Sequence, residues 1–63
     1  MYPNLEAEQA RRGHSEEYIA EALGITLQEY RTRKDSGAFS LTDTIKLVKV
    51  YDKPVDYLLR LGV

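Results

Sequence analysis

The side chains of this sequence that are able to do chemistry are its ten Asp and Glu residues, one histidine and a short basic cluster. None of the carboxylates combines with a histidine, a metal-ligand set or a glycine-rich phosphate loop in a recognisable arrangement. His14 has no second histidine and no cysteine to form a metal site with it. We therefore expect no catalytic residue, no metal site, no cofactor and no small-molecule substrate, and do not expect an enzyme.

The basic cluster consists of Arg31, Arg33 and Lys34 beside Thr32. Two interpretations remain open, a contact surface for nucleic acid and a solvated helix face, which is what most charge runs are. The whole chain has nine Lys and Arg against ten Asp and Glu, a net charge of -1, whereas independent DNA-binding domains tend to be basic. Because affinity depends on the field of one face, this balance lowers non-specific attraction without excluding nucleic acid.

The 63 residues suffice for a single domain over 1–63, and a chain this short needs a compact core. There is no cysteine to form a disulfide or a thiolate metal site, which fits the cytoplasm. The apolar runs are too short for a membrane span or a signal peptide. We expect a soluble, cytoplasmic protein.

The elements that must position these side chains are five helices, predicted from their start and stop signals. Ser15, Thr26 and Ser40 are N-cap residues, and Asn4 is the expected cap of the first helix. Glycines end the first three helices, and Pro54 suits the first turn of the last one. The predicted helices span residues 5–12, 16–23, 27–35, 41–52 and 54–60.

No stretch alternates apolar and polar residues long enough to predict a strand, so the fold class is all-α. In the fourth helix Leu41, Ile45, Val48 and Tyr51 recur at near-helical spacing, which predicts an inward apolar face. The expected core is built from apolar residues of all five helices. It comprises Leu5, Ile19, Leu23, Ile25, Tyr30, Phe39, Leu41, Ile45, Val48, Val55, Leu58 and Leu59.

Two stretches carry a family resemblance, SEEYIAEALGITLQEY and TIKLVKVYDKPVDYLLRLG. Together they resemble the Cro and phage-repressor (XRE-type) helix-turn-helix family over nearly the whole chain. The resemblance implies a compact five-helix lambda-repressor-like domain. In this pattern Ala20 is small where two helices cross, and Gly24 takes the turn between them.

The resemblance implies a sequence-specific DNA-binding transcriptional regulator, Cro-like or a small repressor. The helix that begins at Thr26 and ends near Asp35 would enter the major groove of operator DNA. Its base-facing residues would be Leu27, Gln28, Arg31 and Thr32, with Gln28 suited to adenine, Arg31 to guanine or a phosphate, and Leu27 to a thymine methyl. The expected phosphate contacts are Ser15, Thr26 and Arg33.

Some residues depart from the family pattern and favour an alternative, a protein-interaction module such as an antirepressor that binds another regulator. Glu16 stands where a phosphate-binding glutamine is common, and the loop at residues 37–39 has no basic residue. An internal salt bridge of the family is expected in reversed form, from Glu8 to Arg33 or Lys34.

Four further residues are singled out by the sequence. Leu61 and Val63 near the end of the chain either complete the core or form an exposed patch for a homodimer, which would match the two-fold symmetry of an operator. His14 is expected to pack partly buried. Tyr18 is either a phosphate donor or a surface aromatic.

Overall fold

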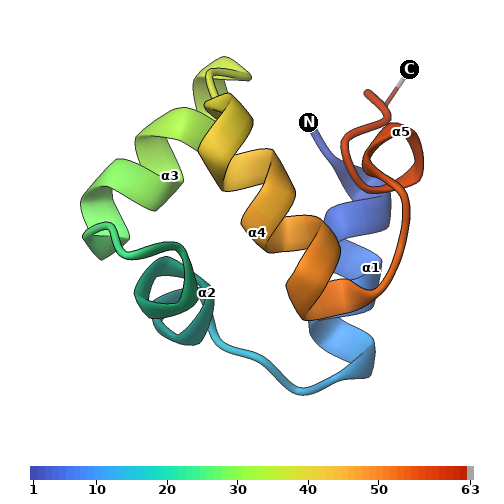
Figure 1. Ribbon diagram of the computed structural model, residues 1–63, viewed down its shortest axis with the longest axis horizontal. Coiled ribbons are helices and arrows are strands. Elements are labelled where there is room, and N and C mark those ends of the chain that lie inside the picture. Colours follow the sequence, from blue (N-terminus) through green and yellow to red (C-terminus); the bar gives the residue numbers. More distant parts are fainter. Residues whose placement is uncertain (63) are drawn as a thin grey trace.

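The computed structural model describes residues 1–62 and is all-α, with no strand in that range. Five helices follow one another in a globule of 26 × 23 × 18 Å (Figure 1). They are α1 (Pro3–Arg11), α2 (Glu16–Leu23), α3 (Leu27–Ser36), α4 (Leu41–Tyr51) and α5 (Val55–Leu58). The predicted fold class and number of helices are confirmed.

The three predicted serine and threonine caps are confirmed. The side-chain oxygens of Ser15, Thr26 and Ser40 accept hydrogen bonds of 3.0–3.1 Å from the backbone N–H three residues on. α3 and α4 each begin with a complete capping box, in which the third helical residue bonds back to the cap. Gly24 and Gly37 end α2 and α3 with φ values of 74° and 71°, the left-handed region in which a Cβ is unfavourable.

The predicted boundaries are wrong at both ends of the chain. Asn4 is not an N-cap, because α1 already begins at Pro3, and the Asn4 side chain instead donates a 2.9 Å hydrogen bond to the carbonyl of Tyr57. Pro54 precedes α5 in an extended conformation and is itself the cap residue. The last helix is a single turn, ending at Leu58.

The helices pack in pairs around a single hydrophobic core. α2 contacts both α3 and α4, while α5 contacts α4 and α1. The two ends of the chain lie on the same side of the molecule (Figure 1), where the Gly62 N–H donates a 3.0 Å bond to the carbonyl of Met1. α2 and α3 form a corner whose far end, at Gly37, lies beside Met1 and Tyr2.

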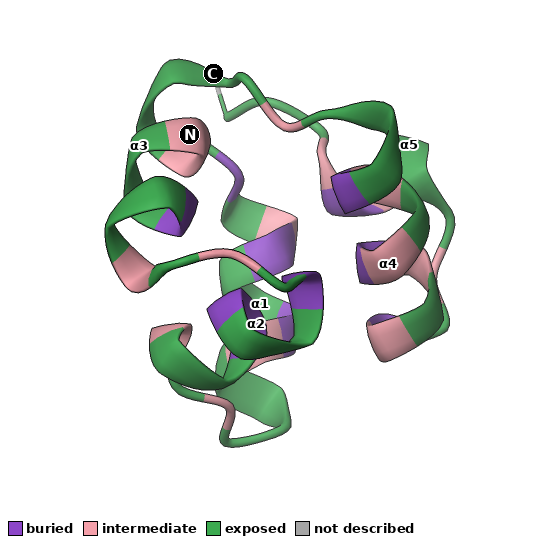
Figure 2. Cartoon of the chain, turned by 60° about the vertical axis from the view of Figure 1, so that its left-hand side comes forward, coloured by how far each residue is buried: buried purple, intermediate pink, exposed green. Residues whose placement is uncertain are grey.

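The core lies where the five helices face one another, as the purple ribbon in Figure 2 shows. The apolar and aromatic residues at most 5% exposed are Tyr2, Leu5, Ile19, Ala20, Leu23, Tyr30, Leu47, Tyr51 and Leu58. Partly buried around them are the predicted residues Ile25, Phe39, Val48 and Leu59. Three predicted core residues are wrong: Leu41, Ile45 and Val55 are 77%, 49% and 43% exposed.

Two of the three errors, Leu41 and Ile45, arise in α4, because that helix carries apolar residues on more than one side. Leu47 and Tyr51 point inward together with Asp43, and this leaves the row of Leu41 and Ile45 on the outer side. Apolar spacing alone does not identify which of two rows is covered, since both have helical periodicity.

Substitutions in the buried row and in the exposed row of α4 should differ in their effect on the free energy of unfolding. Leu47→Ala removes a fully buried side chain, so it should lower the free energy of unfolding by about 2–5 kcal/mol. Ile45→Ala, two residues away on the exposed row, should change it by less than about 1 kcal/mol. Urea unfolding followed by circular dichroism measures both. Equal losses of stability in the two variants would contradict the assignment of Leu47 to the buried row and of Ile45 to the exposed row.

Candidate nucleic-acid interface

The corner of α2 and α3 is built by small residues and a short turn. Ala20 is 2% exposed where the two helices cross, and a larger side chain there would separate them. After Gly24, the Ile25 N–H bonds back to the carbonyl of Ala20 at 3.0 Å. α3 therefore leaves the turn at an angle set by packing, with Tyr30 buried beneath it and its opposite face in solvent.

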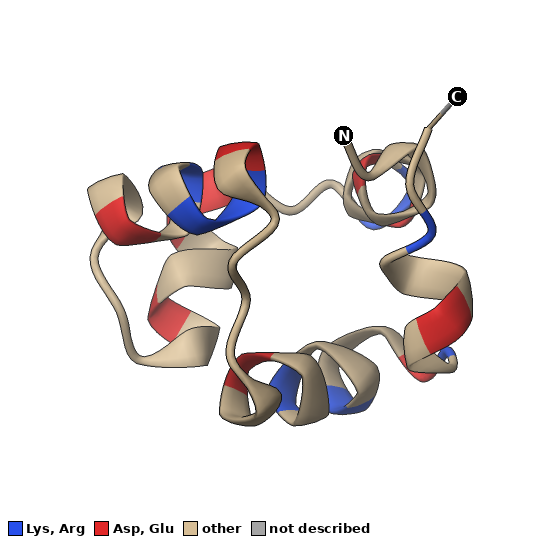
Figure 3. Cartoon of the chain, turned by 90° about the horizontal axis from the view of Figure 1, so that it is seen from above, with Lys and Arg blue, Asp and Glu red and all other residues tan. Residues whose placement is uncertain are grey.

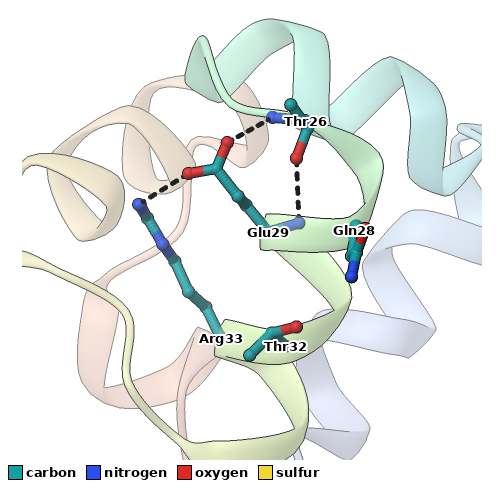
Figure 4. Close-up of a pocket in the computed structure, with 5 residues that line it drawn as sticks. All are labelled: Thr26, Gln28, Glu29, Thr32 and Arg33. Atoms are coloured by element: carbon teal, nitrogen blue, oxygen red, sulfur yellow. Dashed lines mark hydrogen bonds and ion pairs between the residues drawn. The ribbon is translucent and has the colours of Figure 1, made fainter.

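Several predicted site residues lie together on the first turns of α3 (Figure 4). Thr26, Gln28, Thr32 and Arg33 border a shallow pocket of about 250 Å³ together with Glu29, a residue that the sequence analysis did not single out. Gln28 and Thr32 are exposed and one helical turn apart. The pocket is therefore a polar recess at the start of α3.

The remaining predicted site residues lie outside this pocket. Leu27 is half-buried, Arg31 is exposed on α3, and Ser15 is exposed at the start of α2. The oxygens of Ser15 and Thr26 accept from the backbone of their own helices, but a hydroxyl that accepts still has its O–H to donate. Both caps therefore keep a donor for an anionic partner.

Each cation of α3 has a carboxylate partner. Basic and acidic segments alternate along the ribbon of the molecule (Figure 3). Arg33 bonds to Asp43 of α4 at 2.7 Å and lies 3.4 Å from Glu29. Its guanidinium thus links α3 to α4, and its side chain is only 30% exposed. Sequence reasoning assigned Arg33 to a phosphate and missed this internal role.

Glu16 at the start of α2 holds the other two cations. Its carboxylate is 2.8 Å from Lys34 Nζ and 3.3 Å from Arg31 Nε. The hydrogen bond from Lys34 lowers the pKa of Glu16, and this outweighs the opposing effect of its partial burial. The basic cluster that the sequence predicts is therefore largely neutralised by carboxylates of the same chain.

The expected salt bridge from Glu8 to Arg33 or Lys34 is wrong. Glu8 is 1% exposed and pairs with Arg11 at 2.6 Å, on its own helix, while also accepting from the Tyr57 hydroxyl at 3.2 Å. A buried carboxylate needs nearby donors, and the end of α1 supplies them without reaching α3.

Three residues between the end of α1 and the first turn of α2 have defined surroundings, namely Arg12, His14 and Tyr18. The guanidinium of Arg12 caps the end of α4, where it donates to the carbonyl of Tyr51 at 2.6 Å. His14 is half-buried and its ring stacks on Tyr18 with centroids 4.1 Å apart, as expected for a packing residue. Tyr18 remains 51% exposed.

Asp43 holds Arg33 of α3 in place, and the sequence analysis did not single it out. Burial tends to raise the pKa of its carboxyl, but hydrogen bonds from the backbone of Ser40 and from Arg33 outweigh this and lower it. A signal was present, since Ser40 with an acid three residues later is a capping-box pattern. This pattern does not predict that Asp43 pairs with Arg33, because the two residues lie on different helices.

Comparisons with protein-family models, curated proteins and solved structures find no match for this chain. Within residues 1–62, no three or more His, Cys, Asp or Glu side chains are grouped so that they could hold a metal ion. No helix in this range is long and apolar enough to cross a bilayer.

Neutralising Asp43 should destabilise the protein in a pH-dependent way. A carboxyl whose pKa is lowered on folding stabilises the native state at pH values above its unfolded pKa, and this stabilisation is lost as pH falls through the folded pKa. Asp43→Asn should therefore lower the free energy of unfolding by about 1–3 kcal/mol at pH 7 and by progressively less below about pH 4.

Denaturation at a series of pH values measures this effect. Asp35→Asn, at an exposed acid of α3 with no ion pair among residues 1–62, serves as the control and should change little. A loss of the same size at pH 2 and pH 7 would show that the charge of Asp43 is unimportant.

Proposed function

We propose that this chain is a sequence-specific DNA-binding transcriptional regulator, Cro-like or a small repressor, which inserts α3 into the major groove. The observation that carries the proposal is the pair of Gln28 and Thr32, exposed one turn apart on the outer face of the second helix of a helix-turn-helix corner. Side chains at the start of such a helix reach base edges when it lies in the groove. Gln28 would read adenine through its amide.

The neighbouring residues would set position on the duplex. Ser15 and Thr26 would donate their hydroxyl hydrogens to phosphates, supported by the positive ends of α2 and α3. Arg31 is 57% exposed, and its bond to Glu16 is long at 3.3 Å, so it is the cation of α3 best able to reach DNA. Leu27 would contact only a thymine methyl.

Arg33 has a different part in this proposal from the one its charge suggests. Its bond to buried Asp43 holds the start of α4 against α3. Replacing it would reduce DNA binding through the fold as well as through charge, so Arg33 is a poor test of a phosphate contact.

A homodimer on a palindromic operator is part of the proposal, since two-fold protein symmetry matches two half-sites. Leu61 is 59% exposed, as an intermolecular contact at the tail requires. Val63, the other residue of the expected tail contact, lies outside the described residues.

A second candidate function is a protein-interaction module such as an antirepressor. The internal neutralisation of Arg31, Arg33 and Lys34 favours it, because phosphate contacts supply most non-specific DNA affinity. Retention on heparin with elution by salt supports DNA binding, whereas unretained passage of the folded protein supports this alternative.

The deciding experiment is selection from a random-sequence DNA pool at low and moderate salt, with sequencing of the retained molecules. Recovery of a short palindrome whose binding weakens with salt would support an operator-binding dimer. No retention at low salt, by protein shown to be folded, would reject DNA binding.

Gln28→Ala should relax the base preference at one position of each half-site. The loss of a bidentate contact corresponds to about 1–3 kcal/mol of discrimination against the wrong base. The same pool selection measures it, with Gln9→Ala on α1 as the control that should leave the preference unchanged. An unchanged preference in the Gln28 variant would disprove this readout.

Glu16→Gln should strengthen DNA binding several-fold, because it releases Arg31 for a phosphate, while Lys34 keeps Glu6 as a partner at 3.7 Å. One added phosphate contact would steepen the slope of log K against log salt by up to about 1. Glu17→Gln is the matched control, since it removes the same charge next door without a cation partner among residues 1–62. Equal effects of the two variants would mean that net charge alone matters.

A further inference from the structure

α2 ends without a basic residue of its own. The last turns of α1, α3 and α4 carry Arg or Lys, whereas the last turn of α2 carries neither. The C-terminus of a helix has a partial negative charge, and its last carbonyls lack an N–H partner within the helix. The end of α2 also begins the turn into α3, so its geometry affects the direction of the helix that bears Gln28 and Thr32. The donors that hold this end therefore matter for the candidate interface.

The donors at this end come from the turn and from another helix. The backbone N–H groups of Gly24 and Ile25 each donate to a carbonyl of α2 at 3.0 Å. The carbonyl of Leu23, the last residue of α2, instead accepts from the ammonium of Lys46 on α4, also at 3.0 Å. A cation in this place is favoured by the dipole of α2 as well as by the hydrogen bond. α4 thus supplies the charge that α2 lacks.

Lys46 is committed to this turn. Its side chain is half-buried, and its ammonium has no carboxylate of residues 1–62 within ion-pair distance. A Cβ on Gly24 would lie 3.6 Å from the Nζ atom of Lys46, so the ammonium lies directly beside the left-handed residue that ends α2. The cation therefore contacts both the last carbonyl of α2 and the residue at which the chain changes direction.

α4 also holds the other helix of the corner. Asp43, three residues before Lys46, accepts from Arg33 of α3 at 2.7 Å. Residues three apart lie on the same side of a helix, so one side of α4 carries an acid for α3 and a cation for α2. Both contacts are hydrogen bonds with an ionised group, which are stronger than those between neutral groups. α4 therefore holds the α2–α3 corner at two points.

We propose that Lys46 is a positioning residue for DNA recognition, whose ammonium fixes the end of α2 and the Gly24 turn and so sets the direction in which α3 presents Gln28. The inference rests on the proposed function, and it gives Lys46 no contact with DNA. Side chains that read a ligand must be held within about 0.5 Å of their productive place. Loosening the turn therefore weakens specific binding, whereas binding to any duplex depends mainly on phosphate contacts and changes little.

Binding to two duplexes of equal length over a series of salt concentrations tests the proposal. One duplex is the operator recovered from the random pool by the wild-type chain, and the other has a random sequence. Lys46→Met keeps the length of the side chain and removes its donor, so it should lower the affinity for the operator by about tenfold. Its affinity for the random duplex and its salt slope should stay close to those of the wild type. Lys46→Arg, which is able to donate to the same carbonyl, should restore most of the loss.

Lys49→Met is the matched control. It removes the same charge from the same helix, at an exposed lysine whose ammonium has no hydrogen bond or ion pair among residues 1–62. It should bind both duplexes nearly as the wild type does. Circular dichroism at the temperature of the binding assay shows that each variant is folded, which separates positioning from a loss of stability. If Lys46→Met does not fold, Lys46→Gln, which is polar and shorter, replaces it.

Two outcomes would overturn this proposal and leave DNA binding intact. Equal operator affinities of Lys46→Met and Lys49→Met would show that the bond to Leu23 does not guide α3. A parallel loss on both duplexes, with a salt slope smaller by about 1, would show that Lys46 contacts a phosphate. A wild-type chain that selects no DNA would instead reject the proposed function, and the role of Lys46 with it.

Discussion

Asp43 is one of two charged residues in the described chain that folding takes out of water, the other being Glu8. An unpaired buried carboxylate would cost several kcal/mol, so its donors must be in place when the core closes. For Asp43 they are the Ser40 backbone and Arg33. The same carboxylate thus starts α4, fixes α4 to α3 and holds the charged end of α3 inward.

The pairing of cations with carboxylates also determines which charges the surface presents. Arg33 is committed to Asp43, while Arg31 and Lys34 are held by Glu16, so a helix with three cations presents mainly amide and hydroxyl groups to solvent. A domain of this kind would recognise a partner more by hydrogen bonding than by long-range attraction. Charged side chains without an ion pair among residues 1–62 include Glu17 and Glu21 on α2 and Asp35 near the end of α3, and none of these residues lines the polar recess at the start of α3.

The termini and the two buried carboxylates use two different sets of contacts around the one core. Glu8, Arg12 and the Met1–Gly62 bond join α1 to the end of α4 and to α5. The α2–α3 corner is held instead by Ala20 and by the Arg33 link. Lys46, which donates to the carbonyl of Leu23 at 3.0 Å, joins the two sets, because it reaches from α4 to the end of α2.

The sequence by itself determined the local structure: Ser15, Thr26 and Ser40 begin helices, and Gly24 and Gly37 end them, because caps and turns depend on neighbouring residues only. It also placed Gln28 and Thr32 on one face of a helix. Only the tertiary structure decided that Leu47 rather than Ile45 is buried, and that Arg33 pairs with Asp43 rather than Glu8. Both outcomes depend on which helices become neighbours, and helical spacing is the same for a covered row and an open one.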